Sequence, residues 1–349
     1  MNNLRVIGVV AGAMMMAAPA LATTTNTTEA PGTSVTSGQV VRQMSAQTAG
    51  GIGSRIGSFL SPQVLAGQGV DPERAALFAD GALGTGMSAG GGDGRLSVWV
   101  SGGWSQIEDD LASTAYDGDI YNLLVGGDYQ FNDRFLGGVA LGYESGDIDT
   151  NFNTGNIESD GFTIAPYAGY VLNRYLTVDV SGGYTFADYD MSRNPAAGAL
   201  VTGSTEGDRW FLGGNLNAYY AVNRVTLGGR VGYLYTKEEQ DAFTESNGTA
   251  IAQNDISIGQ FRVGGTVGYM LGKVEPYVTG TYVYDAQQEK ITVAAGQATP
   301  SNDRSGIDVG GGIRFSLSDR VTGGFEGTTH VGRDDFDSTS LTGNLRIKF

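Results

Sequence analysis

The chain has 349 residues, of which 37 are acidic and 21 basic, so its formal net charge is −16; it has no cysteine and one histidine. This charge argues against a nucleic-acid partner, which needs a basic footprint, and the missing cysteines exclude disulfides, thiol catalysis and thiolate metal sites. The composition of 40% hydrophobic and 10% aromatic residues with 56 glycines predicts a folded chain built from strands.

The first 22 residues have the organisation of a secretory signal peptide. Arg5 supplies a positive start, an apolar stretch runs from Val6 to Ala18, and Ala20-Leu21-Ala22 forms a small-residue cleavage site. A membrane anchor needs roughly twenty apolar residues, and this stretch is shorter. We therefore expect a cleaved signal peptide over 1–22. No later apolar run has the length of a spanning helix, so the exported chain is either soluble or crosses a membrane as strands.

Residues 23–94 are predicted to be a flexible segment that contains one amphipathic helix. The start of this segment is rich in Thr, Ser and Gly, which is typical of a tether. Over 39–60, apolar residues recur at helical spacing: Val41, Met44, Ile52, Ile56 and Phe59. The glycines at 50, 51, 53 and 57 each weaken a helix by up to ~1 kcal/mol relative to alanine. This helix therefore needs a surface or a lumen to lie against.

The end of the same segment is predicted to be a short helix followed by a hinge. Asp71-Pro72-Glu73 opens the helix, which runs to Phe78, and seven glycines lie within 81–94. The residues 84–89 match a dinucleotide-binding glycine fingerprint, but no strand precedes them and no amphipathic helix follows. A glycine-rich hinge is the better interpretation.

From Arg95 onward the sequence has the period-two pattern of strands with two unlike faces. Val225, Leu227, Val231 and Tyr233 share one face of such a segment, whereas Thr226 and other small or polar residues share the opposite face. The final segment shows the same alternation up to Phe349. Twelve strands are predicted, near 95–106, 117–131, 134–145, 159–172, 175–188, 208–222, 225–237, 256–271, 274–286, 305–317, 321–332 and 340–349.

The connections between these strands alternate in length and charge. Five short turns each carry a basic residue, as in Asn173-Arg174 and Asn223-Arg224. Six long loops hold 25 acidic and 6 basic residues between them; they are 106–119, 144–160, 188–209, 236–256, 285–305 and 333–338. The acidity of the chain is thus predicted to lie at one end of the sheet.

These properties predict an all-β fold, a 12-stranded antiparallel transmembrane β-barrel with an N-terminal amphipathic helix. Only helices or closed sheets satisfy the backbone inside hydrocarbon, and helices are excluded by the hydropathy. Bacterial outer-membrane barrels have an even strand number, apolar outsides, polar lumens, short periplasmic turns and long outer loops. Aromatic girdles are expected near strand ends, at Tyr129, Phe131, Phe135, Tyr143, Tyr175 and Tyr219.

Over 95–349 the chain resembles the translocator barrel of autotransporters. The resemblance rests on the strand count, the segments Trp99–Trp104 and Val139–Tyr143, and the alternation that ends in Phe349. It implies residence in the outer membrane of a Gram-negative bacterium. It also implies four partners, namely outer-membrane lipid, lipopolysaccharide, the barrel assembly machinery that reads a terminal aromatic residue, and periplasmic chaperones. The helix near 39–60 is similar to helices that precede this barrel, some of which thread its lumen.

The chain departs from the family pattern in its front end. Only 72 residues lie between Ala22 and Arg95, in place of a long β-helical passenger. Paired asparagines of the kind used for self-cleavage occur only at Asn2-Asn3, inside the signal peptide. A short, passenger-poor member of the family is expected.

Candidate catalytic residues are few. His330 is predicted to face the lumen near the outer rim, where Asp334, Asp335 or a serine would have to complete a hydrolase site. No Gly-x-Ser-x-Gly motif is present, so a wetted lumen residue is the preferred interpretation. We expect no catalytic, cofactor-binding or metal-ligating residue, no cofactor and no enzymatic activity.

Paired acidic residues occur at Asp109-Asp110, Glu238-Glu239 and Asp334-Asp335. Such pairs can serve as a general acid and base, or bind divalent cations between the loops and lipopolysaccharide phosphates. Solvated loop charge is the preferred interpretation, and calcium or magnesium bridging stays a hypothesis.

Charged residues are also predicted to face the lumen: Asp179, Glu275, Asp308, Glu326, Arg230, Arg262, Arg314, Arg346 and Lys348. They can pair with one another, hold a plug helix or line a pore, and mutual pairing is the default. The preferred function is a structural or surface protein that anchors or exposes a short N-terminal segment. The alternatives are a small-solute channel and, last, a barrel hydrolase.

Overall fold

The computed structural model describes residues 24–25, 33–70, 95–194, 198–288, 292–293, 303–318 and 321–348. Several sequence predictions therefore lie outside the described residues: the signal peptide over 1–22, the short helix over 71–78, the glycine-rich hinge over 81–94 and the terminal residue Phe349.

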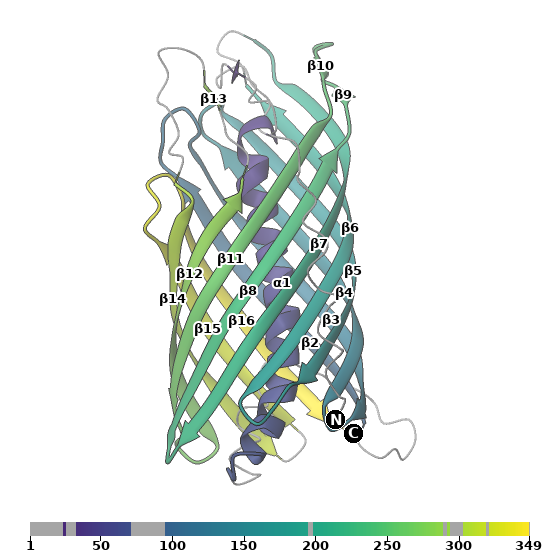
Figure 1. The fold of residues 1–349 in the computed structure, drawn as a ribbon. Helices are drawn as coiled ribbons and strands as arrows, with labels where there is room; N and C mark the ends of the chain where they lie inside the picture. Colours follow the sequence, from purple (N-terminus) through teal and green to yellow (C-terminus); the bar gives the residue numbers. More distant parts are fainter. Residues whose placement is uncertain are drawn as a thin grey trace, which may run out of the picture.

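Twelve strands form a closed antiparallel barrel in which each strand pairs with its neighbours in the chain and the last strand, β16, pairs with the first, β2 (Figure 1). The strands are β2 (Leu96–Asp109), β3 (Tyr116–Asn132), β4 (Phe135–Thr150), β5 (Gly155–Val171), β6 (Leu176–Arg193), β7 (Val201–Val222), β8 (Val225–Gln240), β11 (Asn254–Tyr269), β12 (Val274–Gln287), β14 (Ser305–Ser318), β15 (Val321–Val331) and β16 (Asp337–Lys348). The predicted architecture is confirmed.

Two small strand pairs lie outside the barrel sheet. The antiparallel pair is β9 (Phe243–Thr244) with β10 (Ala250–Ile251), and the parallel pair is β1 (Thr24–Thr25) with β13 (Thr292–Val293). Three of these strands lie in the connections after β8 and after β12. We call the barrel end that carries these connections the long-loop rim, and the opposite end, which includes 172–175 and 223–224, the short-turn rim.

The strands extend further toward the long-loop rim than the sequence predicted. For example, β6 ends at Arg193 and β7 begins at Val201, so Asp188 lies opposite Glu206 in the sheet and not in a loop. Neighbouring β5 places Glu158 opposite Asp190 in the same way. These carboxylates point outward into solvent, so the acidity is at the predicted end, but much of it lies on paired strands. The sequence pattern predicts loops here because the outward side chains are acidic. Strands that extend beyond the hydrocarbon need no apolar outer face, so acidic residues can lie on them.

The outward face of the barrel is apolar, as predicted for contact with lipid. Large apolar side chains such as Leu123, Val278 and Phe325 are exposed there. The aromatic residues predicted near strand ends are also exposed, namely Tyr129, Phe131, Phe135, Tyr143 and Tyr175. Tyr219 was assigned wrongly to this girdle, because the alternation along β7 turns Tyr220 outward and Tyr219 toward the lumen.

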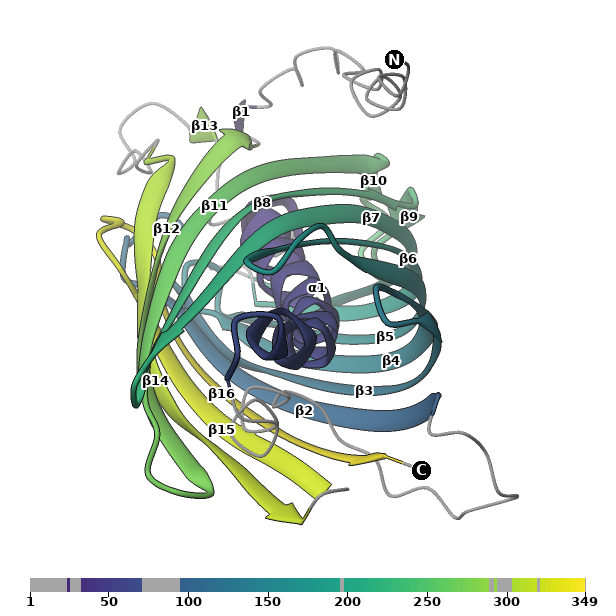
Figure 2. The same cartoon turned by 60° about the horizontal axis from the view of Figure 1, so that its bottom comes forward.

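One helix, α1 (Thr33–Ala66), runs through the lumen, as the view from the short-turn rim shows (Figure 2). It is longer than the predicted 39–60. The barrel wall buries its apolar residues on several sides, which offsets the low helix propensity of its glycines. In the described part of the chain, no helix has the length and apolar character needed to cross a membrane.

The direction of α1 in the barrel follows from its end contacts. Near its start, Ser37 hydrogen-bonds Gln240, the last residue of β8 at the long-loop rim. Just beyond its end, the Gln68 side chain donates to the backbone carbonyls of Arg174 and Tyr219 at the short-turn rim, both at 2.8 Å. The helix therefore enters at the long-loop rim and leaves at the short-turn rim.

Candidate functional site in the barrel lumen

Arg55 of α1 is held by a carboxylate of the barrel wall. Its Nε and Nη2 atoms donate to the two carboxylate oxygens of Asp128 on β3, both at 2.8 Å. Both side chains are 0% exposed. A bidentate pair that is closed to solvent is geometrically specific, so it fixes both the height and the rotation of α1 in the lumen.

A second layer of side chains orients Asp128. The Tyr167 hydroxyl donates to the same carboxylate at 3.1 Å, and the Trp99 indole donates to the Tyr167 hydroxyl at 2.6 Å. Trp99 is fully buried in the lumen. The hydrogen bonds from Trp99 to Tyr167 and from Tyr167 to Asp128 thus hold the carboxylate in the orientation that accepts Arg55.

Arg42, the other charged residue of α1, docks near the long-loop rim. Its guanidinium lies 3.0 Å from the Asp285 carboxylate on β12, which also receives Arg333 at 2.7 Å and an amide hydrogen of Gln260 at 2.8 Å. The helix carries no acidic residue. Each of its two positive charges is therefore matched by a wall carboxylate. At 1.5 Å per residue, Arg42 and Arg55 lie about 20 Å apart along the helix axis.

Apolar packing joins α1 to the wall on one side. Ile52, Ile56 and Leu60 of the helix are fully buried. They belong to a cluster with lumen-facing residues of β2–β8, namely Trp99, Leu124, Leu136, Ala140, Ala165, Tyr167, Val171, Phe211 and Leu234. The barrel pattern predicts a polar lumen, and this part of the prediction is wrong for β2–β8. These strands bury apolar side chains against the helix.

Glycines permit the close approach of helix and wall. A Cβ atom on Gly51 would lie 2.7 Å from Leu124 Cδ1, and one on Gly57 would lie 3.0 Å from the Tyr219 hydroxyl. From the wall side, a Cβ atom on Gly169 of β5 would clash with Ile56 and would lie 2.8 Å from Leu60 Cδ1. Glycines that were expected only to weaken the helix therefore also give it its fit.

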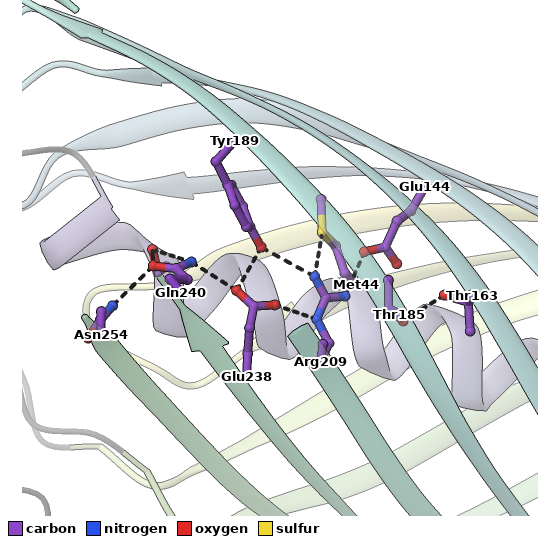
Figure 3. A network of polar contacts seen from close by, with 10 residues as sticks. Met44, Glu144, Thr163, Thr185, Tyr189, Arg209, Glu238, Gln240 and Asn254 are labelled. Atoms are coloured by element: carbon purple, nitrogen blue, oxygen red, sulfur yellow. Dashed lines mark hydrogen bonds and ion pairs between the residues drawn. The ribbon is translucent and has the colours of Figure 1, made fainter. Parts of the chain in front are cut away.

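A buried ionic network lies beside the part of α1 nearer the long-loop rim, around Met44 (Figure 3). Arg209 of β7 pairs with Glu238 of β8 and Glu144 of β4, each at 2.6 Å, and its third nitrogen lies 3.7 Å from the sulfur of Met44. The Tyr189 hydroxyl donates to Glu238 at 2.7 Å. This network links four strands, β4, β6, β7 and β8, beneath the long-loop rim.

The interpretation of the paired acids as solvated loop charge is wrong for two of them. Glu238 lies on β8, faces the lumen and is 0% exposed within the Arg209 network. Asp109 ends β2 and is buried, with its carboxylate accepting from the Leu111 amide at 2.7 Å and the Thr114 hydroxyl at 2.8 Å. In these two pairs, alternation turns the first member, Asp109 or Glu238, inward and the second member outward.

The other four residues of the three acidic pairs follow the prediction of solvated charge more closely. Asp110 and Asp334 are exposed, and Glu239 is exposed beside Lys237, with which it pairs. Asp335 is partly exposed. Within the described ranges, no three histidine or acidic side chains converge as a metal site would require. The acids thus do not form a common centre there.

His330 faces the lumen, as predicted, but it is buried and not wetted. Its Nδ1 lies 2.6 Å from Asp308 Oδ1, and its ring packs edge-on against Phe336. Within the described chain, Nε2 of the ring has no hydrogen-bond partner, so no serine hydroxyl is held there for activation.

The remaining lumen charges pair in part as expected. Arg262 pairs with Asp308 at 2.9 Å, and Arg314 lies 3.3 Å from Glu275. Asp179 is instead held by the amide groups of Asn215 at 2.7 Å and Asn217 at 2.6 Å, to which the sequence offered no clue. The roles of Asp128 and Asp285 were also missed. The one available signal was that α1 has two arginines and no acid, which demands wall carboxylates.

The two sides of the lumen differ in access to water. Lumen-facing residues of β2–β8 are mostly buried, for example Ser105, Thr163 and Thr185. In the middle of the opposite wall, most lumen-facing residues keep partial exposure: Arg262, Thr266, Tyr277, Thr279, Thr281, Asp308, Arg314, Glu326, Thr328, Ser340, Thr342 and Asn344. We call β2–β8 the dry wall and β11, β12, β14, β15 and β16 the wet wall.

Comparison with known proteins adds a family and a fold. The family model described as "Autotransporter beta-domain" matches residues 98–328. Uncharacterised proteins named YaiT are 26% identical over 265 residues in Escherichia coli and 24% over 263 residues in Salmonella typhimurium, which is 72% of this chain in each case. Esterase EstA of Pseudomonas aeruginosa is 26% identical over 168 residues, or 46% of this chain. The chain spans only 26% of the length of each of these relatives.

Solved autotransporter domains have the same fold. The translocator domain of NalP from Neisseria meningitidis superposes with a TM-score of 0.63 at 15% identity, covering 73% of this chain and 88% of that one. The β-domain of Bordetella BrkA gives 0.62 at 16% identity, with coverages of 73% and 100%. The transport unit of AIDA-I from Escherichia coli gives 0.56 at 14% identity, with coverages of 84% and 99%. At these identities the likeness concerns the fold alone.

Proposed function

The chain belongs to the autotransporter β-domain family and is an outer-membrane, autotransporter-like barrel; from this premise we propose that α1 is a resident plug which anchors the preceding segment at the cell surface. The observation that carries the proposal is the docking of both α1 arginines on buried wall carboxylates. A helix in transit through the lumen would have no need of two charge partners and a fitted glycine surface.

The direction of α1 supports surface exposure of what precedes it. Long loops of outer-membrane barrels lie outside the cell and short turns face the periplasm. The start of α1 lies at the long-loop rim, and Thr24–Thr25 pairs with Thr292–Val293 in the connection after β12. The segment ahead of α1 therefore belongs on the outer side.

Export and assembly complete the proposal. We assign 1–22 to a cleaved signal peptide, 23–94 to the segment that holds the plug helix, and 95–349 to the barrel. The partners are outer-membrane lipid, lipopolysaccharide, periplasmic chaperones and the barrel assembly machinery of a Gram-negative cell. Depleting that machinery is expected to leave the chain protease-sensitive and extractable by urea, whereas a folded barrel in depleted cells would contradict this part.

Protease treatment of intact cells tests the surface anchor. A protease site inserted between Thr25 and Thr33 is expected to be cut in intact cells. The same site inserted between Asn173 and Arg174, in a short turn, is the matched control and is expected to be cut only after the outer membrane is permeabilised. If the first site also needs permeabilisation, the segment does not reach the surface.

An open channel is disfavoured because α1 occupies the lumen and its residues 55–61 are all buried. In single-channel recordings, deleting residues 23–94 is expected to produce steady conductance that the full chain lacks. Equal conductance of both proteins would support a pore instead.

We also propose that the barrel is not an enzyme. The relatives named esterase match this chain over only 26% of their own length, and no serine is bonded to His330 in the described part of the lumen. The purified barrel is expected to give no hydrolysis of p-nitrophenyl butyrate above buffer. Activity that disappears in His330→Ala would contradict this.

The outer carboxylates suggest one lipid contact. Divalent cations can bridge exposed carboxylates such as Asp110 and Asp334 to lipopolysaccharide phosphates. A chelator is expected to leave the barrel folded but to release co-purifying lipopolysaccharide; unchanged co-purification would remove the bridging hypothesis.

A further inference from the structure

One stripe of α1 is open to water although the helix lies inside the barrel. Gln43, Ala46, Gln47 and Gly50 keep partial exposure and Ser54 is exposed, at spacings of three, one, three and four residues. These spacings place them on one helix face. A Cβ atom added to Gly50 would have no neighbouring atom within 4 Å, so open space lies beside the stripe.

The wet wall carries the matching exposure from the barrel side. Its lumen-facing positions are mainly Thr, Gly and Ser; at the middle of the wall, Thr279 of β12 and Thr328 of β15 both lie level with Gly310 of the strand between them, β14. Small polar side chains leave room between wall and helix, and their hydroxyls can hydrogen-bond water in that room. The exposed positions of α1 and of the wet wall therefore face a solvent-accessible space on this side of the helix, which Gln43 bridges by its hydrogen bond to Ser340 of β16 at 3.2 Å.

Toward the short-turn rim the space closes. Helix residues 55–61 are buried without interruption. Arg346 of β16 is buried there and lies over the Phe59 ring at 5.7 Å, with Arg55 over the same ring at 5.6 Å. In the described chain, no carboxylate pairs with Arg346, and its Nε has no hydrogen-bond partner. A buried guanidinium without a paired carboxylate at this point of the lumen disfavours the passage of cations.

Toward the long-loop rim a second contact closes the space. Arg42 and Arg333 share the Asp285 carboxylate, and His330 is buried against Phe336. Asp285 is fully buried. Between these two closures, exposure persists on the α1 stripe and at the middle of the wet wall, and also at Asn215 and Arg230 of the dry wall.

The hydrated middle has a simple charge pattern. Arg262 and Asp308 neutralise one another at 2.9 Å, and Arg314 faces Glu275 at 3.3 Å. Glu326 accepts a hydrogen bond from the Tyr277 hydroxyl at 2.7 Å, and no basic side chain in the described chain pairs with it. One uncompensated carboxylate thus lines the space, which favours cations over anions.

We propose that the space between the α1 stripe and the wet wall is a gated passage for water and small cations, closed toward the periplasm by Arg346 and Phe59 and toward the outside by Arg42, Asp285 and Arg333. It rests on the proposed role of α1 as a resident plug. The plug fills the dry half of the lumen and leaves the wet half as a second route through the same barrel.

Cysteine accessibility tests the passage, because the chain has no native cysteine. Ser54→Cys on the open stripe is compared with Ser58→Cys, four residues on, where the serine is buried and donates to the Arg55 carbonyl at 2.7 Å. Both are treated, in detergent, with the small cationic reagent 2-(trimethylammonium)ethyl methanethiosulfonate. Adding Arg346→Ala is expected to accelerate the Ser54→Cys reaction roughly tenfold or more and to leave Ser58→Cys slow, because a buried thiol is out of reach of the reagent and forms little thiolate.

The outcomes separate the passage from the plug. No acceleration of Ser54→Cys by Arg346→Ala overturns the passage while the plug stands. Fast reaction of both cysteines, with or without Arg346→Ala, means that α1 is not resident and overturns both proposals.

Single-channel recording provides a second measurement. The double variant Arg346→Ala with Arg333→Ala removes one side chain from each closure and leaves the Arg42–Asp285 and Arg55–Asp128 pairs in place. It is expected to conduct with cation preference, which Glu326→Gln reduces. Arg174→Ala, at an exposed short turn, is the control and is expected to leave the wild-type trace unchanged. A double variant that is silent, or that prefers anions, overturns the proposal.

Discussion

The dry wall and the wet wall enclose the same helix but contact it in different ways. On the dry wall, lumen positions such as Leu124 and Phe211 are apolar and buried with α1. On the wet wall the equivalent positions are threonine, glycine and charged residues that are partly exposed, and most of these charges are paired. Strand alternation is equally regular in both. The difference shows that the chemistry of the inward face decides whether a barrel wall adheres to a plug or stays hydrated.

The largest difference between the walls is expected at their ion pairs. Asp128→Asn on the dry wall removes one partner of a pair in which both side chains are 0% exposed. Leaving Arg55 buried and unpaired is expected to cost about 3–5 kcal/mol in the free energy of unfolding. Urea unfolding of the barrel in detergent micelles, followed by tryptophan fluorescence, measures it. If Asp128→Asn lowers the free energy of unfolding by less than Arg262→Gln on the wet wall does, the two walls do not differ in this way.

Steric fit is expected to give the next effect. Gly169→Ala on the dry wall introduces a methyl group against Ile56 and Leu60 of α1. Overpacking of this kind is expected to destabilise the barrel by roughly 1–3 kcal/mol in the same urea experiment. Stability equal to wild type would mean that α1 does not press on this wall.

The opposite sign is expected on the open stripe of the helix. Gly50→Ala places a methyl group where no atom lies within 4 Å, and alanine favours helix over glycine by up to about 1 kcal/mol. The unfolding free energy is therefore expected to rise. A decrease would show that this face of α1 is packed and would remove the distinction between the two sides of the helix.

The smallest effect is expected at the wet-wall ion pair. Arg262 and Asp308 are 29% and 23% exposed, so water can replace either partner. Arg262→Gln is expected to change the unfolding free energy by only about 0–1 kcal/mol, and less at high salt. A loss as large as that of Asp128→Asn would place this pair in a dry environment.

The barrel itself was accessible from the sequence. The period-two pattern located strand β8 at 225–237, against Val225–Gln240 in the structure, and β12 at 274–286, against Val274–Gln287. Errors arose at the long-loop rim, where strands such as β7 start earlier than expected, because acidic residues on a strand above the membrane look like loop. The prediction that Tyr219 belongs to the aromatic girdle was wrong for a related reason. An aromatic residue near a strand end can lie on either face of the sheet, and its position near the end does not say which.

The lumen was accessible only in outline. Alternation placed Asp179, Glu275 and Asp308 inward, and helical spacing marked the core of α1. Neither pattern could pair Arg55 with Asp128, 73 residues away, or Arg42 with Asp285, 243 residues away. Such pairs depend on the height and rotation of the helix, which are set by packing against glycines and apolar residues of several strands at once.

The amino-acid sequence by itself determined that this chain closes into an even-stranded barrel with an apolar exterior, because a period of two and the need to pair every backbone group in lipid leave few other solutions. Only the tertiary structure decided that Glu238 and His330 are buried, that α1 binds one wall and leaves the other hydrated, and which carboxylates receive its arginines. Alternation fixes the face of a side chain but not its depth or its neighbours, and these depend on contacts between segments far apart in the chain.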